Sequence, residues 1–223
     1  ALFGYLHDIT FAGQPAVENY KARARILREQ GAPLQAAVKR SHGVTDGPLT
    51  LLTPTGQATG PSGDTPAAYI AAALQQAITA TGNQQLGYLD LTMNGEIPAG
   101  WAPLLHDAVR TLGPARLGVP ARLRRAPAAY HSTEQGEMDG PPYLVSVRLI
   151  TRGHEVSVLG AYTDTFLQAQ AVGTWQAMIE QGRACFLLII DGTDDEAVDA
   201  LGRLFTAVEG RLGPNGAASA DAP

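Results

Sequence analysis

Apolar residues recur along this chain with two different spacings. In some segments they alternate with polar residues, which is typical of strands with one buried face, and in others apolar residues recur every three or four positions, which is typical of helices. In the first half, these spacings predict strands over residues 3–11, 49–53 and 88–93, and helices that begin at Pro15, Leu34, Pro66 and Trp101.

The second half repeats this order of elements. It opens with a predicted strand over residues 115–123 and a polar connector over 126–142. Residues 143–151 and 154–160 alternate on both sides of Arg152-Gly153, which predicts a β-hairpin. The remaining predicted elements are a helix from Asp164, a strand over 184–190 and a helix that ends at Leu212.

The two halves resemble each other in detail as well as in order. The strands over 88–93 and 186–190 both leave through a turn, Asn94-Gly95 in one and Asp191-Gly192 in the other. Both final helices end in Leu-Gly-Pro, at 112–114 and 212–214. A separation of this length is typical of a duplicated domain. Coincidence is the alternative, because Leu-Gly-Pro is a common helix ending.

The repeat predicts an α+β fold of two tandem, pseudo-symmetric modules, residues 1–114 and 115–213, followed by a flexible tail at 214–223. Each module would contain a strand, a connector, a β-hairpin, a helix, a strand and a helix. We expect antiparallel sheets with helices packed on one face. Two modules related by a pseudo-two-fold axis would leave a cleft between them, and such clefts commonly bind ligands.

Composition and charge narrow the class of protein. The hydrophobic fraction of 45%, the charged fraction of 17% and the net charge of −5 are those of a globular protein that is not generally attracted to nucleic acid or anionic membranes. The longest apolar run, residues 184–190, is far shorter than the roughly 20 residues of a membrane span. The only cysteine, Cys185, excludes an intramolecular disulfide and a cysteine-rich zinc site.

The location is predicted to be the cytoplasm of a bacterium. The N-terminal residues do not have the pattern of a signal peptide, although Ala1 follows either a removed methionine or a cleaved signal. Lysine occurs only at Lys21 and Lys39 and is replaced by arginine, which is typical of alanine- and glycine-rich proteins from GC-rich bacteria.

Candidate ligand-binding residues are few. The residues that we expect to contribute to a cleft are Asp90, His131, Arg152 and His154. His131 lies close in sequence to Glu134, Glu137 and Asp139, a cluster that fits a solvated loop or, alternatively, a lid or metal-binding loop over the cleft. No two histidines have a common metal-ligand spacing, so we expect no metal and no cofactor.

The second half also carries a basic segment, with arginines at Arg116, Arg122, Arg124 and Arg125. Alternation places Arg122 and Arg124 on one face of a strand, where they would contact a phosphate or nucleic acid. The competing interpretation is an edge strand protected by charge, which the acidic net charge favours.

Three functions are compatible with these observations, and they follow here from the most to the least favoured. The first is a non-catalytic interaction or regulatory protein, which binds a protein partner, a second copy of itself or a ligand. The second is an enzyme or small-molecule binder that uses the cleft between the modules. The third is a nucleic-acid accessory protein that uses the segment from Arg116 to Arg125, although we expect nucleic acid to be an improbable partner for an acidic chain.

Overall fold

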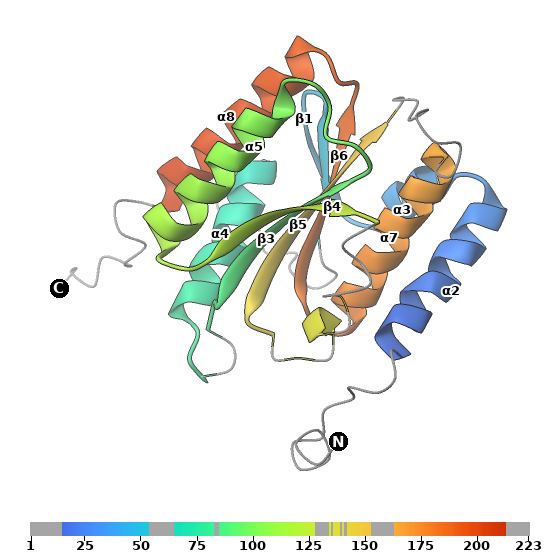
Figure 1. Cartoon of the computed structure of the whole chain (residues 1–223), viewed down its shortest axis with the longest axis horizontal. Coiled ribbons are helices and arrows are strands. Elements are labelled where there is room, and N and C mark those ends of the chain that lie inside the picture. The colour runs from blue at the N-terminus through green and yellow to red at the C-terminus, as the bar shows by residue number, and fades with distance from the viewer. Residues whose placement is uncertain are drawn as a thin grey trace.

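A mixed six-stranded sheet organises the fold, with helices on both sides (Figure 1). The structure is a computed structural model, and it describes residues 15–53, 65–82, 85–127, 134, 136–138, 140, 142–152 and 163–212. The strands are β1 (Gly43–Asp46), β2 (Leu49–Leu52), β3 (Tyr88–Asn94), β4 (Ala121–Ala126), β5 (Leu144–Arg152) and β6 (Ala184–Asp191). The helices are α2 (Pro15–Gln30), α3 (Pro33–Arg40), α4 (Pro66–Thr79), α5 (Trp101–Arg110), the π-helix η2 (Thr111–Leu117), α7 (Asp164–Glu180) and α8 (Asp195–Leu212).

The strand order is β1-β2-β6-β5-β3-β4. The last four strands in this order are parallel neighbours. The β1–β2 hairpin joins them antiparallel to β6, with Leu51 opposite Leu188. The chain passes from β3 to β4 through α5 and from β5 to β6 through α7, as parallel strands require a crossover connection.

The predicted class, with both helices and strands, is confirmed, but two details of the prediction are wrong. The sheet is mixed rather than antiparallel, and strands from both predicted modules pair within it, because β3 lies between β4 and β5. Helices cover both faces of this sheet rather than one. The physical reason is the β-α-β connection, which places each crossover helix on a sheet face. The internal duplication itself stays a prediction.

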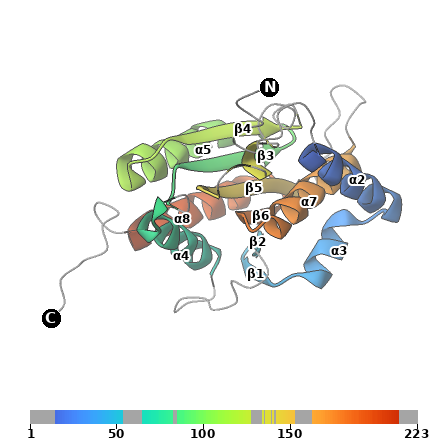
Figure 2. The same ribbon diagram turned by 90° about the horizontal axis from the view of Figure 1, so that it is seen from below.

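Two hydrophobic cores lie on opposite faces of the sheet, beneath the two groups of helices that Figure 2 shows on either side of it. One contains α4, α5 and α8, which pack on the face that includes Leu89, Leu91 and Phe186. The other contains α2, α3 and α7, which pack on the face that includes Leu187 and Ile189. Burial on both faces explains why β6 is apolar at nearly every position.

Local signals set several boundaries. The Thr65 hydroxyl accepts a hydrogen bond from the Ala68 amide at 3.3 Å, and Pro66 follows, so α4 begins where predicted. The predicted strand over 115–123 is wrong in its start, because α5 continues as the π-helix before β4 begins at Ala121. The predicted strand over 3–11, the second arm of the predicted hairpin and the tail at 214–223 lie outside the described residues.

No helix in the described ranges is both long enough and apolar enough to span a membrane.

Candidate functional site

The carboxyl ends of β3 and β5 lie at the point where the chain reverses its direction of travel across the sheet. From β3 the chain continues to α5 on one face, and from β5 it continues to α7 on the other. The two connections diverge, which leaves a crevice between neighbouring strand ends. In open sheets with parallel strands, ligands bind at such a reversal point.

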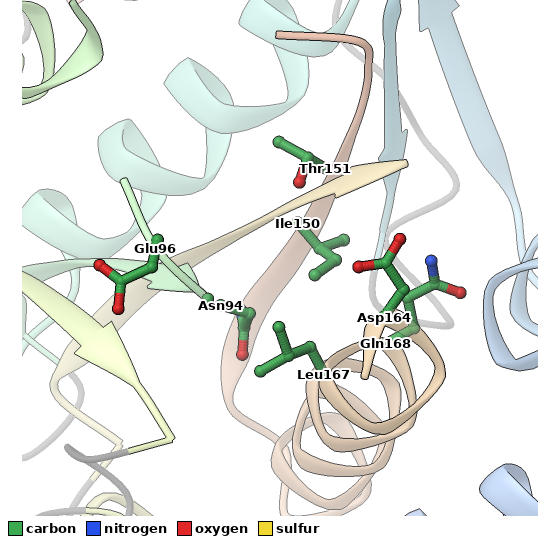
Figure 3. Close-up of a pocket in the computed structure, with 8 residues that line it drawn as sticks. Asn94, Glu96, Ile150, Thr151, Asp164, Leu167 and Gln168 are labelled. Atoms are coloured by element: carbon green, nitrogen blue, oxygen red, sulfur yellow. The ribbon is translucent and has the colours of Figure 1, made fainter. Parts of the chain in front are cut away.

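A narrow crevice is present at this point. The space between its walls, about 230 Å³, includes open solvent and leaves no enclosed room for a water molecule. Its lining residues come from the end of β3, the end of β5 and the first turns of α7: Asn94, Gly95, Glu96, Ile150, Thr151, Asp164, Leu167 and Gln168. Figure 3 shows Ile150 and Leu167 between Asn94 on one side and Asp164 and Gln168 on the other. The crevice therefore has an apolar floor with polar groups on either side.

Hydrogen bonds fix the β3 side of the crevice. The Asn94 amide nitrogen donates to the Leu149 carbonyl at 3.0 Å, and the Gly95 amide donates to the Ala126 carbonyl at 2.9 Å. Gly95 has a φ of +106°, which favours glycine, and a Cβ at this position would lie 3.2 Å from Leu167 Cδ1. The turn at the end of β3 thus brings the backbone close to α7.

The charges on the two sides of the crevice differ in their partners. Glu96 forms an ion pair with Arg125 at 2.6 Å. Asp164 lies in the first turn of α7, after Thr163, whose hydroxyl caps the helix by accepting from the Phe166 amide at 3.2 Å. No cationic side chain among the described residues lies within ion-pair distance of Asp164. Its negative charge offsets the positive end of the helix dipole, so this end of α7 does not favour an anion.

A second set of polar residues is buried beneath the face of the sheet that packs on α7. Asp90 on β3 is 0% exposed and accepts from Arg124 Nε at 2.7 Å and Arg124 Nη2 at 2.9 Å. The Arg122 guanidinium donates to the same carboxylate at 3.1 Å, and the hydroxyls of Thr92 and Ser146 donate at 2.8 and 3.0 Å. Asp90 is therefore fully engaged within the fold.

Two more buried carboxylates, Glu134 and Glu137, enter this cluster from the segment between β4 and β5. Arg148, which is 0% exposed, donates to Glu134 at 3.1 Å, and Arg124 lies 3.0 Å from Glu137. Arg183 donates to the main-chain carbonyls of Glu137, Met138 and Gly140 at 2.8, 2.5 and 2.6 Å. These contacts attach this segment to the sheet.

Burial changes the proton affinity of the cluster. Burial disfavours ionisation of Asp90, but the charge and hydrogen bonds of Arg124 outweigh it and hold the pKa of this carboxyl below its usual range. For Glu137, burial and the neighbouring charge of Asp90 outweigh the arginines, and its pKa lies above its usual range. Burial, with the charge of Glu137, also raises the pKa of the Tyr88 hydroxyl.

The structure brings together only some of the predicted site residues. Asp90, Arg122 and Arg124 meet in the buried cluster, whereas Arg116 pairs with Glu209 at 2.6 Å. Arg152 pairs with Asp191 at 3.3 Å, beside the crevice residue Thr151. His131 and His154 lie outside the described residues.

The arginine segment predicted to contact nucleic acid is engaged by carboxylates. Arg116, Arg122, Arg124 and Arg125 each form an ion pair with an aspartate or glutamate of the same chain. Within the described ranges, no group of three or more histidine, cysteine, aspartate or glutamate side chains is placed to hold a metal ion.

Sequence reasoning missed most of the crevice. Asn94-Gly95 indicates only a turn and Asp164 only a helix start, because nothing local shows that two such positions meet. The order of parallel strands, once known, is the signal that would have identified them.

Comparisons with known proteins add little to this geometry. No protein-family model matches the chain, and no curated protein matches its sequence. Among solved structures, the chain is similar to a hypothetical protein from Thermus thermophilus, with 16% sequence identity and a TM-score of 0.43. The similar region covers 67% of this chain and 45% of that protein, so it spans less than half of the other chain.

Proposed function

We propose that this chain is a binding protein for a small polar molecule that carries a cationic amine, held at the mouth of the crevice at the carboxyl ends of β3 and β5. The observation that carries the proposal is the Asp164 carboxylate, which lines the crevice and has no cationic partner among the described residues. A carboxylate in a partly enclosed site favours a cation, and a charge-assisted hydrogen bond to an amine is stronger than a neutral one.

The other lining groups support a polar ligand. Gln168 and Thr151 offer side-chain donors and acceptors, while Ile150 and Leu167 provide a short apolar floor. Ligand sites commonly combine an apolar surface with a few polar groups that orient the ligand. The crevice has no enclosed room for a water molecule, so the ammonium group of the ligand would contact Asp164 at the mouth of the crevice.

Anionic ligands are disfavoured by the same residues. The carboxylates Asp164 and Glu96 both line the crevice, and Glu96 is paired with Arg125. A phosphate or carboxylate ligand would meet the negative charge of Asp164 at the N-terminus of α7. We therefore expect the crevice to bind amines and not anions of similar size.

The test is a thermal-stability screen of the full chain with small amines, amino alcohols and amino acid amides, against carboxylates and phosphates of matched size. We expect at least one amine to raise the melting temperature, because a ligand that binds only the folded state stabilises it. An Asp164→Asn variant should abolish this stabilisation. A chain stabilised by anions alone would overturn the proposal.

The chain offers a matched control for this variant. Asp195 occupies the first turn of α8 as Asp164 occupies that of α7, but Asp195 does not line the crevice. Asp195→Asn should leave amine binding unchanged. Mass spectrometry of the recovered ligand distinguishes binding from catalysis, since an enzyme would return a chemically altered molecule.

A further inference from the structure

The buried polar cluster around Asp90 is assembled from two separate parts of the chain. The sheet contributes three arginines, from β4 and β5, and one carboxylate, from β3: Arg122, Arg124, Arg148 and Asp90. The acidic segment, residues 134–140 between β4 and β5, contributes the two other carboxylates, Glu134 and Glu137. With every group ionised, the sheet part alone has an excess of positive charge, and the acidic segment neutralises it.

The two carboxylates of the acidic segment share the same guanidinium groups. A carboxylate oxygen of Glu134 lies 3.1 Å from Arg148 Nη2 and 3.8 Å from Arg124 Nη1. Glu137 lies 3.0 Å from Arg124 Nη2 and 3.6 Å from Arg148 Nη2, and it also pairs with Arg122. Two carboxylates on shared guanidiniums are arranged as the two ends of one short dicarboxylate would be. The acidic segment thus shows which chemical group these arginines bind.

Packing alone does not account for these charges. In the register of β5 and β6, Arg148 lies opposite Leu187, which packs in the apolar core on the same face of the sheet. Removing charges from water is costly, and apolar side chains of similar volume often stabilise a fold as well or better. Arg148 is nevertheless 0% exposed and Arg124 only 9%. A role in anion binding explains buried arginines at a position where an apolar side chain would pack.

The acidic segment lies on the sheet without being part of it. None of its described residues pairs with a strand, and Arg183 holds it through three of its main-chain carbonyls. One turn is closed within it, where the Gly140 amide donates to the Gly136 carbonyl at 2.8 Å. A Cβ at Gly140 would collide with that same carbonyl oxygen, whereas Gly136 has open space around it. The segment can therefore leave the arginines without the loss of any strand pairing.

We propose that Arg122, Arg124 and Arg148 form a binding site for a small dicarboxylate, and that Glu134 and Glu137 occupy this site as built-in competitors. The carboxylates of the ligand would replace those of the acidic segment on the same guanidinium groups, whose planar donors suit a carboxylate. Arg122, with a side chain that is 35% exposed, lies where the ligand would enter. This site is separate from the crevice beside Asp164.

Hydrogen exchange of the wild-type chain tests whether a ligand displaces the acidic segment. Malonate should accelerate amide exchange in the peptide that covers residues 134–140, relative to acetate or chloride at the same ionic strength, because a bound dicarboxylate favours the displaced state. Exchange that malonate leaves unchanged would overturn the proposal. A stronger effect of inorganic phosphate than of malonate or succinate would overturn the ligand class.

Calorimetric titration of variants with malonate measures the competition. Glu134→Gln/Glu137→Gln removes the competing charges, so it should bind at least about tenfold more tightly than the wild type, because a site that is mostly occupied binds its ligand with reduced apparent affinity. Glu209→Gln is the control, since it removes a carboxylate from the pair with Arg116 outside the site. Thermal unfolding should confirm that each variant is folded.

A second pair of variants keeps every charge in place. Gly140→Ala should disturb the closed turn and tighten malonate binding, whereas Gly136→Ala, in the same turn but with open space, should not. Equal affinity of the wild type, Gly140→Ala and the double glutamine variant would contradict the competition. Asp164→Asn should leave malonate binding unchanged, which separates this site from the proposed amine site.

Discussion

Arg124 and Asp90 form a two-pronged ion pair across neighbouring parallel strands, with both contacts below 3 Å, the Asp90 side chain fully buried and the Arg124 side chain 9% exposed. Arg124→Ala would leave the Asp90 charge buried with reduced compensation. Removal of one partner of a buried pair costs about 3–5 kcal/mol. We expect a loss of this size in the free energy of unfolding, measured by urea denaturation.

The double variant Asp90→Ala/Arg124→Ala tests whether this pair acts as a unit. We expect it to lose less stability than the two single variants added together, because neither charge is then stranded by the absence of the other. Additive losses would show that Arg122 and Glu137 compensate each charge separately.

The pH dependence of stability should reveal two opposite contributions from the cluster. The pKa of Glu137 is raised by burial and by Asp90, so the unfolded chain releases its proton first as pH rises above 4.5. The wild type should therefore lose stability relative to Glu137→Gln as pH rises through that range, measured by denaturant unfolding at a series of pH values.

Asp90 should behave in the opposite way. Its pKa is lowered, so its contribution is present above 3.8 and is lost as pH falls below that value. The wild type should lose stability relative to Asp90→Asn in acid. Parallel pH profiles for either variant and the wild type would contradict the corresponding shift.

Much of the secondary structure was predictable because it depends on local pattern, whereas the pairing of strands does not. The strands at Leu49–Leu52, Tyr88–Asn94 and Ala184–Asp191 follow the alternation or apolar runs seen in the sequence. Alternation alone does not distinguish parallel from antiparallel partners, and it gave no sign that β5 pairs in parallel with both β3 and β6.

The candidate site was harder to predict for a related reason. Asp90 alternates with Leu89 and Leu91, which places it on the second face of its strand. The sequence does not indicate that Arg124, on another strand, and Glu137, on a connector, meet it there. The crevice could not be predicted without the strand order, since only that order brings Asn94 and Asp164 together.

Gly95→Ala should both destabilise the fold and weaken binding in the crevice. The positive φ costs an L-residue about 1–2 kcal/mol, and the added methyl meets Leu167 Cδ1 at 3.2 Å. Gly100→Ala is the control, because it shares a positive φ of +85° but has nothing within 4 Å. Thermal unfolding should show a loss for both variants, and ligand titration should show weaker binding for Gly95→Ala alone. Equal binding by the two variants would place the ligand elsewhere.

Cys185 should resist thiol reagents in the folded chain. It is fully buried, and burial raises its pKa to about 11, so the reactive thiolate is scarce near neutral pH. A chromogenic disulfide reagent should titrate one thiol in denaturant and react slowly without it. Rapid reaction of the native protein would indicate that β6 opens locally.

The pairing of β2 with β6 joins segments that lie far apart in the sequence, as Leu51 lies opposite Leu188. During synthesis, β2 leaves the ribosome long before its partner exists, so this edge of the sheet forms late and depends on non-local contacts. Until then, the leucines that are buried in the finished sheet, Leu49, Leu51 and Leu52, belong to an apolar strand that is paired on one edge only, with β1. A chain that stops before β6 would keep this strand exposed, and such an edge favours aggregation over folding.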